Sequence, residues 1–347
     1  MPAERATFPS KATDAGAVVA DARWLADRYD PGHDAFHFRH VTRDEHRAAM
    51  FLTDEYLAAS LPVVVGRGDA IAAAPPPAPL RFIFHSAFCC STLLARAVDA
   101  PGVAMGLKEP VVLNDLIGWK ARGATPAELT AVLGDALALL ARPFAPGEAV
   151  VVKPSNIVNG LASAMLALRP ESRALLLVAP LRTFLGSITR KGMWGRVWVR
   201  DLLVKQIEDG TQWPGMTTPE FLCLTDLQAA AIGWLAQHAI FARIALRFPG
   251  RVRTLDSETL MAGPGVALTA LAALFALDLD GPAIAAGPVF AAHAKFGGAF
   301  DGAARTAARE AEGPFADEID KVTIWAEAVA AGVGLGLMLP GALLQHS

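Results

Sequence analysis

The sequence predicts an α/β protein with a central parallel sheet, helices on both faces of that sheet, and a helical N-terminal extension. A length of 347 residues is enough for one large α/β domain. Hydrophobic residues make up 53% of the chain and charged residues 19%, which is typical of an ordered globular protein. From residue 80 onward, short apolar runs alternate with longer segments of helical pattern, as in βαβ units.

Residues 1–79 are predicted to form the N-terminal extension. In Val18–Tyr29 the apolar residues follow helical spacing, and Arg43–Leu57 is also helical in pattern. Between them, His37–Val41 alternates like a short strand. The Pro-rich run Ala72–Pro79 is expected to be a stiff linker that leads into the main domain.

Residues 80–347 are predicted to form the main domain. Its expected strands are Leu80–Phe84, Val103–Lys108, Ala149–Lys153, Ala174–Val178 and Arg251–Leu255. Its expected helices are Ser91–Ala100, Pro126–Ala141, Ile157–Leu168, Arg182–Arg190, Thr225–Phe248 and Gly265–Phe275. The run of Leu and Val in Ala174–Val178 is typical of a parallel strand buried on both faces. The apolar run Val329–Leu344 is interrupted by Pro340 and Gly341, so we expect a core-packed terminal helix and no membrane span.

The most informative motif is the stretch His85–Thr92, between the first strand and its helix. Its length matches a Walker-type phosphate loop, but Cys90 and Ser91 stand where that motif has Gly and Lys. Such a loop binds anions through backbone N–H groups and first-turn hydroxyls. The alternative is an ordinary turn in which Ser91 or Thr92 caps the helix. The missing lysine argues against ATP hydrolysis and favours another anionic donor.

Other polar residues also follow apolar strands. His85 ends the first strand and Lys153 the third, at the edge where α/β sheets place ligands. A buried lysine must be paired, so Lys153 is expected to meet either a carboxylate or an anionic ligand. The basic stretch Arg190–Arg200, with Trp194 and Trp198, is either a lid over an acceptor or a solvated loop.

Several segments resemble one family when they are taken in order along residues 80–300. The matching segments are Cys90–Arg96, Lys108–Pro110, Leu175–Ser187, Arg251–Leu260, Leu274–Leu277 and His293–Gly298. In order and spacing they resemble the sulfotransferases that use 3′-phosphoadenosine 5′-phosphosulfate, especially the bacterial members of that P-loop superfamily. The chain departs from the family pattern at two places. The loop lacks its usual Lys or Arg, and Ala179 stands where the 3′-phosphate segment has its first Arg.

The resemblance implies a P-loop nucleotide hydrolase-like fold and transfer of a sulfuryl group to a hydroxyl or amine acceptor, either a small molecule or a peptide. It implies that 3′-phosphoadenosine 5′-phosphosulfate is the co-substrate and that no metal is needed. Glu109 would be the general base, and the alternative for it is a local cap or salt bridge. From their places at the sheet edge, Lys108 could neutralise leaving-group charge, and His85 is either a donor or base or an ordinary hydrogen-bonded histidine at a strand end. The implied nucleotide-binding residues are Ser86, Cys89, Cys90, Ser91, Thr92, Arg182, Ser187 and Lys295.

The sequence is also compatible with two other functions. One is a P-loop kinase or ATPase, which the missing loop lysine disfavours. The other is a non-catalytic nucleotide-binding module, which Ala179 favours. Neither the acceptor nor the oligomeric state can be read from the sequence.

Composition narrows the partners and the compartment. A net charge of −3 gives no basic field for nucleic acid. Two of the three cysteines are adjacent and Met1–Ala20 lacks a long apolar run, so we expect a cytoplasmic protein without a signal peptide. Four histidines between His33 and His46 match no metal-ligand spacing.

Overall fold

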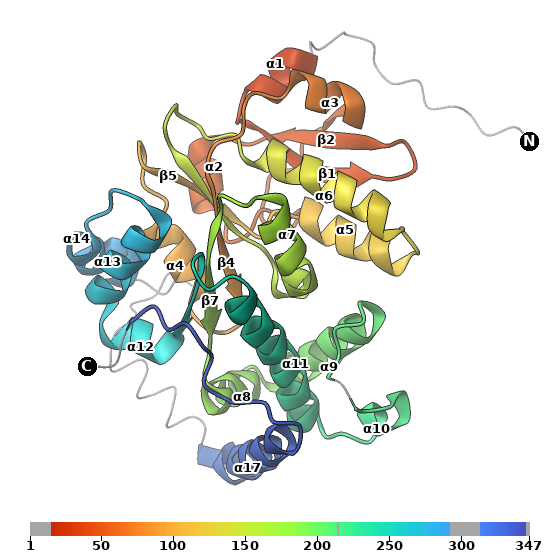
Figure 1. The fold of residues 1–347 in the computed structure, drawn as a ribbon, viewed down its shortest axis with the longest axis vertical. Helices are drawn as coiled ribbons and strands as arrows, with labels where there is room; N and C mark the ends of the chain where they lie inside the picture. Colours follow the sequence, from red (N-terminus) through yellow and green to blue (C-terminus); the bar gives the residue numbers. More distant parts are fainter. Residues whose placement is uncertain (1–14, 214, 292–312, 345–347) are drawn as a thin grey trace, which may run out of the picture.

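The computed structural model describes residues 15–213, 215–291 and 313–344. Its centre is a five-stranded parallel sheet in the order β5-β6-β4-β7-β8 (Figure 1). The strands are β4 (Leu80–His85), β5 (Ala104–Lys108), β6 (Ala149–Lys153), β7 (Arg173–Val178) and β8 (Val252–Asp256). Helices cover both faces, so the predicted α/β class is confirmed.

The strand order creates a reversal at β4. From β4 the chain passes to β5 and β6 on one side, and then crosses to β7 and β8 on the other. In open α/β sheets, ligands bind beyond the carboxyl ends of the strands at such a reversal point. The loop after β4 lies there.

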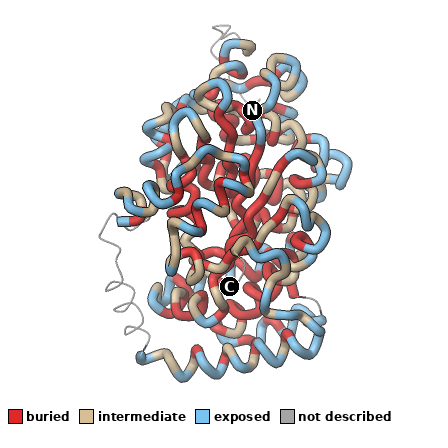
Figure 2. The backbone as a smooth tube through the Cα atoms, turned by 60° about the vertical axis from the view of Figure 1, so that its left-hand side comes forward, coloured by how far each residue is buried: buried red, intermediate tan, exposed pale blue. Residues whose placement is uncertain are grey.

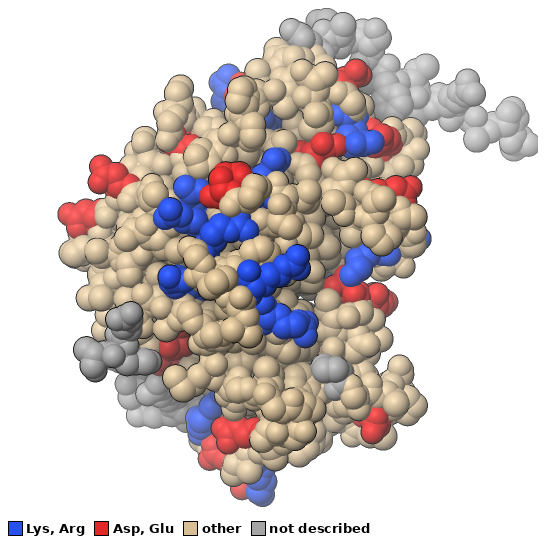
Figure 3. Space-filling model, viewed as in Figure 1, with Lys and Arg blue, Asp and Glu red and all other residues tan. Residues whose placement is uncertain are grey.

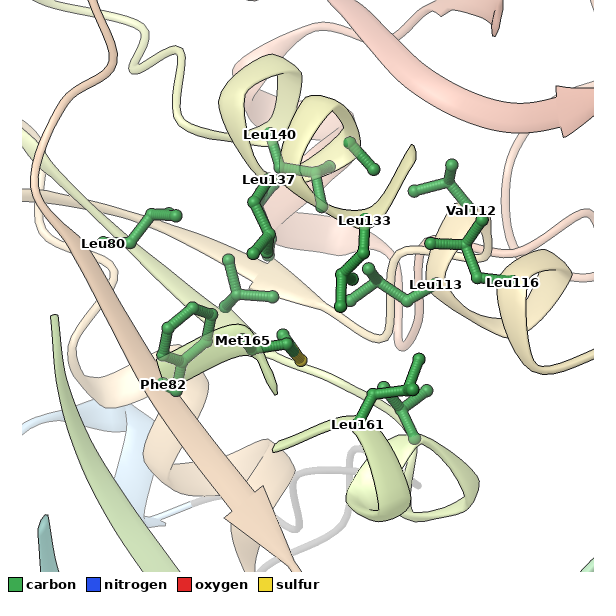
Figure 4. Packing of buried hydrophobic residues seen from close by; sticks show 14 of the residues in the cluster. Leu80, Phe82, Val112, Leu113, Leu116, Leu133, Leu137, Leu140, Leu161 and Met165 are labelled. Atoms are coloured by element: carbon green, nitrogen blue, oxygen red, sulfur yellow. The ribbon is translucent and has the colours of Figure 1, made fainter. Parts of the chain in front are cut away.

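The residues of β4 alternate between the two faces of the sheet, as a strand period of two requires. Phe82 and Phe84 belong to one apolar cluster, whereas Ile83 belongs to the other. The first cluster includes α5 (Val112–Ala121), α6 (Pro126–Leu140) and α7 (Ala162–Leu168), which follows the 3₁₀ helix η1 (Asn156–Leu161). Figure 4 shows Phe82 packed near Leu137 and Met165 in that cluster.

The second cluster packs helices on the opposite face of the sheet. They are α4 (Ser91–Ala97), α8 (Leu181–Arg190), α9 (Gly192–Glu208), α13 (Pro264–Phe275) and α17 (Ala316–Gly332). Smaller elements complete this half: α10 (Thr218–Leu222), α12 (Ser257–Ala262), α14 (Gly281–Ala286), α15 (Pro288–Ala291) and η2 (Gly313–Phe315). Buried backbone runs through the middle of the molecule, with exposed helices around it (Figure 2).

The long helix α11 (Asp226–Arg247) joins both clusters, because its first half packs with the second cluster and its last turns with the first. It is the one helix among the described residues whose length and hydropathy would allow a membrane crossing. However, 78% of its apolar window is buried inside the protein, as in a core helix.

The N-terminal extension differs from the prediction, because it is not only helical. After α1 (Ala15–Ala20), the three-stranded antiparallel sheet β1 (Trp24–Asp30), β2 (Ala35–His40) and β3 (Val63–Gly66) follows. The helix expected over Val18–Tyr29 is therefore wrong in its second half. Pairing of β1 with β2 satisfies that backbone and overrides the helical spacing of its apolar residues. The strand predicted at His37–Val41 is confirmed as β2.

Two other parts of the extension are helical, namely α2 (Arg43–Ala48) and α3 (Arg67–Ala73). The helix expected over Arg43–Leu57 ends early, at Ala48. From there the chain runs along the end of β5, where the Leu52 amide donates to the Lys108 carbonyl over 2.7 Å. This segment therefore reaches the carboxyl edge of the main sheet.

The C-terminal helix also lies elsewhere than predicted. α17 ends at Gly332, and Gly334, with a φ of 71°, turns the chain away from helical geometry. Ala342 then forms a parallel bridge with Thr254 of β8. The run expected to be a terminal helix is thus largely an irregular segment packed beside the sheet.

Surface charge is unevenly spread despite the small net charge. Basic side chains gather near the middle of the face in Figure 3. Several arginines donate to backbone carbonyls, for example Arg251 to Arg169 and Arg173 to Leu274. These arginines stabilise carbonyl-rich chain turns at the amino edge of the sheet, opposite the reversal-point loop.

Candidate active site

A pocket of about 480 Å³ lies beyond the carboxyl ends of β4, β5 and β6. Each of these strands delivers one polar residue to its wall: His85 ends β4, Glu109 directly follows β5, and Lys153 ends β6. Because neighbouring parallel strands end at one edge, three residues that are far apart in sequence meet there.

Glu109 and Lys153 form an ion pair through Glu109 Oε1 and Lys153 Nζ. The lysine side chain is 1% exposed and the glutamate side chain 17%, so the carboxylate is the member that faces the pocket. The ring of Phe51 lies 5.0 Å from the ammonium. A buried ammonium is costly unless it is paired, and these contacts supply its partners. Of the two partners expected for Lys153, the structure contains the carboxylate.

His85 is held in one orientation by two hydrogen bonds. The Ala87 amide donates to His85 Nδ1 over 3.1 Å, which places the imidazole proton on Nε2. Nε2 lies 3.0 Å from the Pro154 carbonyl oxygen and 3.7 Å from Glu109 Oε1. The imidazole therefore donates its N–H to the Pro154 carbonyl, and Glu109 lies slightly beyond hydrogen-bonding distance from it.

Backbone strain is concentrated beside this pocket. Six described residues other than glycine have positive φ, and four of them are Ala87 (69°), Phe88 (49°), Cys90 (64°) and Glu109 (56°). Left-handed geometry is unfavourable for side-chain-bearing residues and persists only where the surrounding structure enforces it. Such strain is often found at functional sites, which makes this edge the leading candidate in the described part of the chain.

The loop after β4 is tied to β7 through Ser86. The Ser86 amide donates to the Leu177 carbonyl, and the Ala179 amide donates to Ser86 Oγ, both over 3.1 Å. Ser91 and Thr92 begin α4 and line the pocket. The start of the loop is thus fixed against β7, and its hydroxyl pair lines the same pocket as Glu109.

The two loop cysteines, Cys89 and Cys90, do not line the pocket. Cys89 is completely buried, and burial raises the pKa of its thiol although the amides of Ser86 and Ser91 interact with the sulfur. Cys89 fills space beneath the loop and is poorly suited to nucleophilic chemistry.

Lys108 does not take part in the site, contrary to its predicted role. Its ammonium donates to the carbonyls of Arg47 (2.9 Å) and Ala49 (2.5 Å), at the C-terminal end of α2. Glu109 follows β5 with a φ of 56° and lines the pocket, whereas Lys108, the last residue of the strand, directs its side chain to α2. Burial, with Arg96 and other nearby charges, lowers the pKa of Lys108 to about 8.

The predicted 3′-phosphate residues lie outside the pocket. Arg182, at the start of α8, pairs with Asp320 of α17 over 3.0 Å and lines a separate cavity of about 400 Å³. Ser187 Oγ donates to the Thr183 carbonyl over 3.0 Å and accepts from Arg190. Lys295 lies outside the described residues.

Two walls of the pocket come from segments whose role was not clear in the sequence. The N-terminal extension supplies Met50, Phe51, Glu55 and Tyr56. The basic stretch after α8 is helical and supplies Lys191, Trp194 and Trp198. Lys191 Nζ lies 5.8 Å from the Phe88 ring centroid and 5.2 Å from that of Trp194. A cation and several aromatic side chains therefore line the same pocket as Glu109. The mixture of Trp and basic residues was the one sequence signal for this wall.

No family model matches the sequence, and no curated protein matches it. Among solved structures, the fold is similar to the sulfotransferase domain from the curacin biosynthetic pathway, with a TM-score of 0.40 and 14% sequence identity. The match covers 62% of this chain and 78% of that chain. A likeness of this size does not indicate a function.

The described residues contain no group of three or more His, Cys, Asp or Glu side chains arranged to hold a metal ion. The charged side chains that line the pocket are two carboxylates, Glu55 and Glu109, and two ammonium groups, Lys153 and Lys191. In this arrangement the hydroxyl groups of Ser91 and Thr92 are placed to bind an anion, and the Glu109 carboxylate is placed to accept a proton.

Proposed function

We propose that the protein transfers a sulfuryl group from 3′-phosphoadenosine 5′-phosphosulfate to a hydroxyl or amine acceptor. The observation that carries this proposal is the meeting of Glu109, Lys153 and His85 at one pocket beside the strained loop Ser86–Cys90. The identity of the proposed sulfuryl donor comes from the sulfotransferase-like segments, which follow one another along the sequence in the order of that family. The loop supports the choice as well, because it has Ser91 where ATP-binding loops have lysine.

In the proposed reaction, the acceptor O–H or N–H gives its proton to Glu109. The acceptor atom forms a bond to sulfur while the bond from sulfur to the bridging phosphate oxygen breaks. The electron pair of that bond leaves with the oxygen, which gives 3′-phosphoadenosine 5′-phosphate and the sulfated acceptor. Sulfur is transferred without oxidation or reduction.

Each pocket residue has a task in this scheme. Lys153 pairs with the Glu109 carboxylate and so holds it in place at the pocket wall. Ser91 and Thr92 donate to the sulfate or phosphate oxygens. His85 gives its Nε2–H to the Pro154 carbonyl and lines the wall beside Glu109. Lys191 stabilises the charge that develops on the leaving phosphate, a role that the missing loop lysine would otherwise fill.

The nucleotide is proposed to extend from the loop toward β7 and α8. Arg182 and Ser187 stand on that side, and their proposed partner is the 3′-phosphate. Arg182 must leave Asp320 to bind it. That exchange is feasible because both side chains are about half exposed and exposed ion pairs contribute little. Lys295 is proposed to close over the nucleotide.

The test is calorimetric titration with 3′-phosphoadenosine 5′-phosphate, followed by transfer from ³⁵S-labelled donor to a panel of phenols, alcohols and amines. We expect saturable binding without added metal and labelled product from at least one acceptor. Binding of the product nucleotide only at millimolar concentration would contradict the proposal. Mg-dependent ATP binding in its place would favour a kinase. Nucleotide binding with no transfer would favour a non-catalytic module.

A further inference from the structure

A second cavity, of about 750 Å³, lies between the N-terminal extension and α4. Most of its lining comes from the chain between His40 and Ser60, and one wall comes from Arg96 of α4. Met50 and Tyr56 line both this cavity and the candidate active site, so the two spaces are neighbours across those side chains.

Arg96 is the feature that indicates a ligand. Its side chain is half-buried and its Nε is buried without a hydrogen-bond partner. Within residues 15–213, 215–291 and 313–344, no carboxylate lies at ion-pairing distance from its guanidinium. Burial lowers its pKa, and no carboxylate among the described residues pairs with the guanidinium to offset the cost of that burial.

The one acidic side chain in the lining does not neutralise Arg96. Glu45 belongs to the capping box of α2, where its carboxylate accepts from the Thr42 amide and hydroxyl, both over 2.7 Å. Behind the wall, the Arg96 charge helps to lower the pKa of Lys108, and Asp99 acts in the opposite direction. An anion is therefore the ligand that this cavity lacks.

The other residues that line the cavity indicate the shape and polarity of the rest of the ligand. Val41, Ala49 and Leu57 are apolar, and Tyr56 and Ser60 add hydroxyl groups. A volume near 750 Å³ is larger than a single inorganic anion needs and lies within the usual range for small-molecule sites. The chemistry fits an organic carboxylate with a compact apolar body.

We propose that this cavity binds an organic carboxylate, with the Arg96 guanidinium as its anchor. The planar fork of arginine matches the two carboxylate oxygens. Resting on the proposed function, we further infer that the carboxylate belongs to the acceptor, whose hydroxyl or amine then reaches past Met50 and Tyr56 toward Glu109.

Calorimetry without any donor tests the first statement. The probes are 3-phenylpropanoate and 3-phenylpropanamide, which share a shape and differ in charge. We expect the carboxylate to bind about tenfold more tightly than the amide. Arg96→Gln should abolish this preference, and Arg96→Lys should retain part of it. The matched control is Arg122→Gln, which removes an exposed arginine outside both cavities and should leave the preference intact.

A second variant keeps the proposal testable if Arg96→Gln fails to fold. Ala58 is exposed and lines the cavity, so Ala58→Trp fills the space without burying a charge or deleting one. It should weaken both probes at least tenfold while far-UV circular dichroism stays unchanged. Equal affinity of the wild type for the two probes would overturn the proposal, and so would a preference that survives both Arg96→Gln and Ala58→Trp.

The link to the acceptor is tested separately with the hydroxylated pair 3-(4-hydroxyphenyl)propanoate and its amide in the transfer assay. We expect a KM about tenfold lower for the acid, and Arg96→Gln should remove this difference while kcat stays within about twofold. Carboxylate binding without sulfation of any acceptor in the panel would contradict the proposed function and leave the cavity assignment standing. Sulfation with no preference for the acid would overturn the acceptor link alone.

Discussion

The two sides of β4 differ in how their polar residues are arranged. On the β5–β6 side, Glu109, Lys153 and His85 meet in one pocket, and the ammonium is completely buried. On the β7 side, Arg182 reaches away to Asp320 and Ser187 is bonded to its own helix. The first side is organised before any ligand binds, whereas the second must exchange partners. Chemistry should therefore depend strongly on the first side, and nucleotide affinity should depend modestly on the second.

The largest effect is expected from Glu109→Gln. Loss of a general base typically lowers the rate by about 10²- to 10⁴-fold, so kcat should fall by that amount while nucleotide affinity changes little. Steady-state transfer and calorimetric titration measure the two quantities. The matched control is Glu171→Gln, an exposed position at the amino edge of the sheet. Turnover that survives Glu109→Gln within threefold would remove the base assignment.

The next largest effect is on stability. Lys153→Met leaves the Glu109 carboxylate without its ammonium, and breaking a buried pair in this way costs about 3–5 kcal/mol. Guanidinium unfolding should show this loss, and Lys153→Met combined with Glu109→Leu should recover part of it. By contrast, Arg182→Gln should cost at most about 1 kcal/mol, since both partners are exposed. The control is Lys321→Met, at an exposed helical pair with Asp317. Similar losses from Lys153→Met and Arg182→Gln would erase the contrast between the two sides.

Buried histidines on each side predict acid instability. Burial lowers the pKa of His46 to about 3 and that of His238 to about 4, from the ordinary 6.5. The unfolded chain therefore binds two more protons than the native protein between about pH 6 and pH 4.5. Stability from these groups is complete above pH 6.5 and falls as pH decreases, by about 1.4 kcal/mol per pH unit for each histidine.

His46→Leu should flatten this acid slope by about one proton in urea unfolding followed across pH. His33→Leu is the control, because the His33 side chain is 77% exposed. A slope that is the same in His46→Leu and the wild type would show that His46 is not held neutral in the native protein.

The smallest effect is expected at Arg182. Arg182→Gln should weaken 3′-phosphoadenosine 5′-phosphate by about three- to tenfold, because the gain from the phosphate is reduced by the lost pairing with Asp320. Adenosine 5′-phosphate, which lacks the 3′ group, should bind equally to both proteins. Asp320→Asn should strengthen the bisphosphate slightly. Parallel losses for the two nucleotides would place Arg182 away from the 3′-phosphate.

The sheet could be predicted because its strands are short apolar runs that only a buried parallel arrangement explains. The loop His85–Thr92 is predicted from its small residues before a helix, and Glu109 from its place after a strand. The local sequence pattern does not predict which residues pair with partners far away in the sequence. Trp24–Asp30 becomes a strand only because Ala35–His40 lies beside it. The Lys153–Glu109 pair likewise depends on the adjacency of β5 and β6.

Side-chain direction explains the other errors. Lys108 and Glu109 are neighbours in sequence, and the positive φ of Glu109, which no residue type announces, directs its carboxylate to the pocket. Phe51 and Tyr56 reach the site because their segment follows the edge of β5, and their own sequence contains no motif for that. Arg182 matched an expected order of motifs, but its observed partner is Asp320 on a helix about 140 residues later.

Both flanks of the parallel sheet are closed by chain from outside the βαβ units. Leu52 hydrogen-bonds to the end of β5, and Gly341 and Leu343 hydrogen-bond to Thr254 of β8. Unpaired edge strands can form hydrogen bonds with other molecules, so these segments protect the protein against self-association. A shortened variant that ends at Leu335 would expose the backbone of β8 and should form light-scattering aggregates on mild heating before the helices melt.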